Sequence, residues 1–156
     1  RRGYFVQGLA GAQPAPPAAV EKLRAAPAVY AGAASTDESP LVFPASDPSN
    51  VWMLQGAGDP FARPRAPGAL LVTLAGQVLL TSDPRARAIA VRAELDAAEV
   101  TAAVRAILTY LAARRGRDII VETIDGRKAA TSPWSQAFVA AGLRLTTRGL
   151  RYYAMS

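Results

Sequence analysis

Residues 69–74 and 77–81 are two apolar segments separated only by Ala75–Gly76. Two strand-length segments with a two-residue connection are typical of a tight β-hairpin. After the turn at Asp83–Pro84, residues 88–92 supply a third strand. The middle of the chain therefore predicts neighbouring antiparallel strands, and this limits the fold to classes that contain such a sheet.

The clearest helix signal begins at Asp96. Glu99 follows three residues later, and the pair resembles a capping box in which Asp replaces the usual Ser or Thr. Gly116 supplies the stop signal at the other end. One buried helical face is indicated by apolar residues at helical spacing, namely Val100, Val104, Ile107, Leu108 and Leu111.

The other segments add strands and helices in an irregular order. We expect strands at 3–9, 41–43, 118–124, 143–147 and 150–155, helices at 17–26 and 132–142, a proline-rich break at 13–17 and an irregular connection at 30–67. This order lacks the regular alternation of a doubly wound sheet. The sequence predicts one α+β domain over residues 1–156, built as a small β-barrel or a strongly curled, mostly antiparallel sheet with two to three flanking helices.

Cysteine and histidine are both absent from the 156 residues. Their absence excludes disulfides, thiolate nucleophiles, imidazole bases and metal sites that need nitrogen or sulfur ligands. We expect no metal and no cofactor in this chain. No apolar run approaches the roughly 18 to 20 residues of a membrane span, and no signal-peptide pattern opens the chain. We expect a cytoplasmic protein without membrane contacts. The first residue is Arg1 and not Met, which predicts flanking domains in a longer polypeptide.

The net charge of +6 is concentrated in the second half of the chain. Residues 1–83 contain 6 basic and 6 acidic residues, whereas residues 84–156 contain 12 basic and 6 acidic ones. Net positive charge attracts phosphate independently of base sequence. The C-terminal half is therefore the candidate region for contacts with nucleic acid.

Several short motifs match one family pattern in chain order. They are residues 1–6 with Gly8–Leu9, Gly11 and Gln13, then 45–50, Gly68–Ala69, 124–126, Ser132–Pro133, 141–143 and 147–151. Over nearly the whole chain this pattern resembles the C-terminal β-barrel module of bacterial large helicase-related (Lhr-type) proteins. Gln7 and Pro14 depart from the family pattern, in which an acidic and an aromatic residue are common at these positions.

The resemblance implies that the full-length protein is an ATP-dependent 3′-to-5′ DNA translocase of DNA repair, which unwinds RNA:DNA and DNA duplexes. It also implies motor domains that hold ATP and magnesium, and winged-helix domains that pack against this module. The chain itself has no phosphate-binding loop and no Asp-Glu motor motif, so we expect no ATPase activity from it. The expected partners are single-stranded DNA or an RNA:DNA hybrid, the winged-helix domains and, as a further option, a second copy.

The candidate nucleic-acid contacts are five basic residues, namely Arg127, Lys128, Arg144, Arg148 and Arg151. Alternation along a strand places Arg144 and Arg148 on one face, where they can hold phosphates without reading bases. Tyr152 is a candidate for stacking on unpaired bases. In the alternative interpretation, the arginines lie on a solvated sheet face and pair with Glu122 or Asp125.

Two further hypotheses remain open. The family resembles winged-helix-and-barrel DNA glycosylases in architecture, and a single carboxylate that activates water can drive N-glycosidic cleavage, which makes Asp125 and Glu122 candidate catalysts. An Asp before a Gly is, however, ordinarily present for turn geometry. The other hypothesis is a purely structural oligomerisation module. Trp52 and Phe61 in the irregular segment are candidate interface residues, because exposed aromatics in a long loop usually contact a partner.

Overall fold

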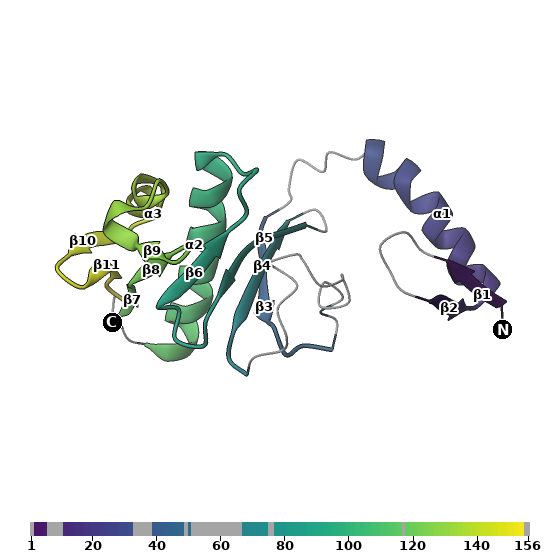
Figure 1. Cartoon of the computed structure of the whole chain (residues 1–156), viewed down its shortest axis with the longest axis horizontal. Coiled ribbons are helices and arrows are strands. Elements are labelled where there is room, and N and C mark those ends of the chain that lie inside the picture. The colour runs from purple at the N-terminus through teal and green to yellow at the C-terminus, as the bar shows by residue number, and fades with distance from the viewer. Residues whose placement is uncertain are drawn as a thin grey trace.

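The N-terminal part of the chain forms a hairpin followed by a helix. The computed structural model describes residues 2–5, 11–32, 39–48, 50, 67–74, 77–116 and 118–154. Strand β1 (Arg2–Phe5) pairs antiparallel with β2 (Ala12–Ala15), and α1 (Pro17–Gly32) follows. Figure 1 shows the hairpin and α1 at one end, apart from the other described elements.

Strand β2 corrects the predicted break at residues 13–17. Pro14 lies within this strand and faces Gly3 of β1. Proline is tolerated at such a position because each strand of a two-stranded ribbon is an edge strand. Helix α1 also begins at Pro17 as predicted, but it continues six residues past the expected end at residue 26.

The larger sheet has six strands in the order β3-β4-β5-β6-β8-β9. Neighbours are antiparallel except for β6 and β8, which are parallel. The predicted central hairpin and third strand are confirmed as β4, β5 and β6. The strands are β3 (Leu41–Pro44), β4 (Leu70–Leu74), β5 (Gln77–Ser82), β6 (Ala88–Val91), β8 (Thr123–Ile124) and β9 (Arg127–Lys128).

The smaller sheet has the order β10-β11-β7 and is antiparallel throughout. Its strands are β7 (Ile119–Val121), β10 (Arg144–Thr146) and β11 (Gly149–Tyr152). The single strand predicted at 118–124 is therefore wrong, because the chain changes sheets at Glu122. The backbone N–H groups of Glu122 and Thr123 both donate to the carbonyl of Arg87, at 2.7 and 3.0 Å, and this turns the chain from β7 into β8.

Helix α2 (Ala97–Arg115) packs between the larger sheet and α3 (Ser135–Ala140), as Figure 1 shows. The predicted capping box is confirmed: the Asp96 carboxylate accepts from the Glu99 N–H at 2.8 Å, and the Glu99 carboxylate accepts from the Asp96 N–H at 2.9 Å. Gly116 ends the helix in the left-handed conformation. The start predicted for α3 at Ser132 is early, because the 3-10 helix η2 (Ala129–Thr131) and a turn precede it.

The main hydrophobic core lies between α2 and one face of the larger sheet. Val100, Val104 and Ile107 of α2 are almost completely buried there, against Val72 and Leu80 of the sheet. The predicted α+β class with a mostly antiparallel sheet is thus confirmed. Within the described residues the larger sheet is open, since β3 and β9 are its two edges, and no closed barrel forms. No helix of the described chain is both long and apolar enough to cross a membrane.

Candidate nucleic-acid interface and a neighbouring cavity

Strand β9 carries two adjacent cations at the edge of the larger sheet. Asp125 and Gly126 both adopt positive φ, 51° and 74°, and this tight turn folds β9 back against β8. Arg127 and Lys128 are exposed, and neither forms an ion pair with any residue that the structure describes. Their charges are therefore available to an external anion.

Arg144 and Arg151 lie directly opposite each other on β10 and β11. Arg151 donates from Nε to Asp118 Oδ2 at 3.0 Å and also from Nη2 to the same oxygen. Its guanidinium lies 4.7 Å from the centre of the Tyr153 ring. The hydrogen bond to Asp118 raises the pKa of Arg151 above its ordinary value. Arg144 is exposed and has no acidic partner among the described residues.

Arg148 lies in the turn between β10 and β11, and not in a strand beside Arg144 as alternation had suggested. Its Nη2 lies 3.9 Å from Glu122 Oε1, and Nη1 of Arg87 lies 3.6 Å from the same oxygen. The Arg148 side chain remains 67% exposed. One carboxylate thus holds two arginines loosely at the surface, in line with the alternative interpretation for Arg148.

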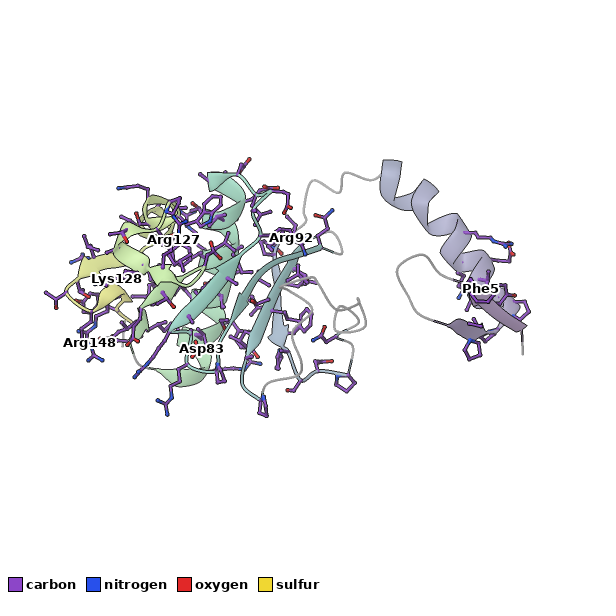
Figure 2. All side chains as sticks on the ribbon, viewed as in Figure 1. Phe5, Asp83, Arg92, Arg127, Lys128 and Arg148 are labelled. Atoms are coloured by element: carbon purple, nitrogen blue, oxygen red, sulfur yellow. The ribbon has the colours of Figure 1, made fainter. Side chains whose placement is uncertain are left out.

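The candidate basic residues gather at one end of the fold. Figure 2 shows Arg127, Lys128 and Arg148 at the end formed by β9, β10 and β11. Tyr152 is half-buried against the main core, whereas its neighbour Tyr153 is exposed and lies beside Arg151. Of the two tyrosines, Tyr153 is therefore the one that a ligand at this end can reach.

The two candidate catalytic carboxylates both have structural partners. Asp125 Oδ1 accepts from the N–H of Val91 at 2.8 Å, and this bond holds the turn after β8 against β6. Glu122 is shared by the two arginines described above. The candidate interface residues Trp52 and Phe61 lie outside the described residues. Within the described chain, no three Asp or Glu side chains are grouped so that they could hold a metal ion.

A cavity of about 690 Å³ lies beside the larger sheet, and its lining includes Leu71 and Ala90 of the second, smaller hydrophobic cluster. Leu71, Thr81 and Ala90 are neighbours across β4, β5 and β6, and they line it together with Asp83 and Asp125. This cavity was not predicted from the sequence. The available signal was the alternation in Ala88-Ile89-Ala90-Val91, which places only small side chains on one face of β6.

No protein-family model matches this chain, and no curated protein is significantly similar to it. The resemblance to Lhr-type proteins therefore stays a prediction from the sequence motifs. The structure also adds residues that the sequence analysis missed, namely Asp118 and Arg87. Asp118 directly precedes β7, which pairs with β11, so an accurate strand register would have placed it near Arg151.

Proposed function

We propose that this chain is a non-catalytic nucleic-acid-binding module whose basic end holds the phosphate backbone. The contact residues are Arg127, Lys128 and Arg144, with Arg148 as a fourth. Such contacts give affinity and position without reading base sequence. They are also sensitive to salt, because binding releases the counterions that surround nucleic acid.

The proposal rests on the difference between paired and unpaired charges at this end of the fold. The nearby carboxylates are already occupied, Asp118 by Arg151 and Glu122 by Arg87 and Arg148. Arg127, Lys128 and Arg144 are left exposed without an acidic partner in the described chain. Exposed cations without an acidic partner at one end of a fold raise the local concentration of polyanions and speed their association.

Arg148 is suited to join these contacts because its present ion pair is weak. An exposed pair at 3.9 Å contributes little to stability and is easily exchanged for another anion. A guanidinium can bind two phosphate oxygens at once, and this contact is stronger than the present one with a single distant carboxylate oxygen. Arg151 differs, since its two hydrogen bonds to Asp118 give it a structural role.

In the larger protein that the motif resemblance implies, this module supports an ATP-dependent 3′-to-5′ translocase in DNA repair. ATP and magnesium belong to the motor domains of that protein. Winged-helix domains, or a second copy, are the proposed neighbours of the module. The hairpin formed by β1 and β2 is a suitable contact for such a neighbour, because Phe5 is 86% exposed there.

Binding to a labelled single strand and to a duplex over a range of salt concentrations tests the proposal. Each phosphate contact adds a log–log salt slope of about 0.9 on duplex DNA and about 0.7 on a single strand. We expect binding with a slope that corresponds to three or four contacts. Absence of binding at low salt would instead support the purely structural oligomerisation module.

A further inference from the structure

The cavity on the sheet has a floor of small and apolar side chains. Leu71 of β4, Thr81 of β5 and Ala90 of β6 form one cross-strand row, and Ala88 and Thr123 continue it from β6 to β8. The alanines remove side-chain volume that larger residues would fill. The resulting volume of about 690 Å³ falls within the range of about 300 to 1,000 Å³ that is typical of small-molecule sites.

Thr81 supplies an unused polar group to this floor. The residue is only 6% exposed, and it lines the cavity. Its hydroxyl forms no hydrogen bond with any residue that the structure describes. The hydroxyl is not among the fully buried side-chain atoms that lack a partner, so it is reached from the cavity. This hydroxyl is therefore placed to bond with a molecule in the cavity.

Two carboxylates lie at the cavity, Asp83 after β5 and Asp125 after β8. Figure 2 shows Asp83 at the end of β5. Each carboxylate uses Oδ1 to accept a backbone N–H, Asp83 from Ala88 at 3.0 Å and Asp125 from Val91 at 2.8 Å. These bonds fix the carboxylates in place and leave Oδ2 of each without a bond to the described residues.

The described lining includes two Asp and no Lys or Arg, so the cavity carries two negative charges. We propose that it binds a small organic cation, in which an ammonium group meets one of these two carboxylates and an apolar body lies against Leu71 and Ala90. The Thr81 hydroxyl accepts or donates one further hydrogen bond. This site is separate from the basic end, and the proposal does not depend on nucleic-acid binding.

Three ligands with one indole body test this assignment on the full chain. Tryptamine carries a cation, tryptophol is neutral and indole-3-acetate is an anion. Affinities are measured by calorimetry, and the site is located by shifts of the backbone amide resonances of Leu71, Thr81 and Ala90. We expect tryptamine to bind about five- to tenfold more tightly than tryptophol, and indole-3-acetate to bind most weakly.

Matched variants distinguish the effect of the cavity's negative charges from the effect of its shape. D83N together with D125N removes both charges but keeps the Oδ1 acceptors, and asparagine tolerates the positive φ of residue 125. This variant should bind tryptamine and tryptophol equally. E94Q removes a negative charge at an exposed residue outside the described lining and should leave the preference for tryptamine unchanged.

A90L fills the cavity and should abolish binding of all three ligands. If A90L does not fold, T81V provides the second test: it preserves the shape of the side chain and should weaken tryptamine and tryptophol alike. The assignment is overturned if no ligand shifts the three amide resonances, if tryptophol binds as tightly as tryptamine, or if the double Asp variant retains the preference for the cation.

Discussion

The guanidinium of Arg151 donates two hydrogen bonds to Oδ2 of Asp118, and Oδ1 of the same carboxylate accepts from the N–H of Ala154 at 3.3 Å. Asp118 directly precedes β7, and Arg151 lies in the adjacent strand β11. One carboxylate thus attaches the last strand and the residues after it to the start of β7. Among the five basic residues predicted to contact nucleic acid, Arg151 is the one with a structural role.

Removing Arg151 should therefore destabilise the fold more than removing Arg144. R151A loses the bonds to Asp118, whereas R144A removes an exposed cation that faces Arg151 across the strand pair. Like charges directly opposite each other are unfavourable, so R144A is expected to be neutral or slightly stabilising. Urea unfolding of both variants measures the difference. Equal unfolding midpoints would show that the Asp118 contact contributes nothing.

Glu122→Gln should strengthen nucleic-acid binding. The carboxylate competes with phosphate for Arg148 and Arg87, and the amide does not. Because the pairs are exposed, we expect a gain of about two- to fivefold in affinity at low salt. E94Q is the control for a general change of charge. An equal gain in affinity in E94Q would show that Glu122 has no specific role. Loss of a base-excision activity in E122Q would instead support the glycosylase hypothesis.

Gly149 and Gly126 should respond very differently to replacement by alanine. A Cβ at Gly149 would lie 2.3 Å from the carbonyl oxygen of Val121, and its φ of 131° also disfavours a side chain. G149A is expected to lower the free energy of unfolding by about 3 kcal/mol or more. Gly126, with φ of 74° and no atom near its Cβ position, is expected to lose only about 1 kcal/mol. Chemical unfolding compares the two, and similar losses would contradict the close approach of β11 to β7.

Asp96→Ala should destabilise α2 by about 1 kcal/mol, because it removes the side chain that accepts the Glu99 N–H. D96S keeps a capping oxygen and should recover most of this loss. Thermal unfolding followed by circular dichroism is suitable for both variants. A Ser variant that is as unstable as the Ala variant would indicate that the charge, and not the cap, stabilises this helix end.

Local signals in the sequence were sufficient for the elements that depend on neighbouring residues. The helix from Asp96 to Gly116 and the antiparallel pair of β4 and β5 were predictable because caps and the spacing of apolar residues are local features of the sequence. The change of sheet at Glu122 could not be predicted in this way. It depends on a carbonyl of Arg87, 35 positions earlier in the chain, and on close packing against Gly149.

The basic residues of the candidate site could be named from the sequence, but their ion-pair partners could not. Charge asymmetry indicated the basic half, and Arg127, Lys128 and Arg144 are indeed exposed. Which arginines are paired depends on the strand register and on Asp118 and Glu122, and periodicity alone does not give these partners. The cavity needed the alignment of four strands, which no local pattern specifies.

The most direct test of nucleic-acid binding compares two triple variants that remove the same net charge. R127A/K128A/R144A changes the proposed contacts, and K22A/R24A/R85A changes exposed cations elsewhere. Binding to duplex DNA is measured from low to moderate salt. We expect the first variant to bind more weakly and to lose between about 2 and 3 units of log–log salt slope, while the second stays close to the unmodified chain. Equal losses in both variants, or no loss in either, would contradict a specific phosphate-binding end.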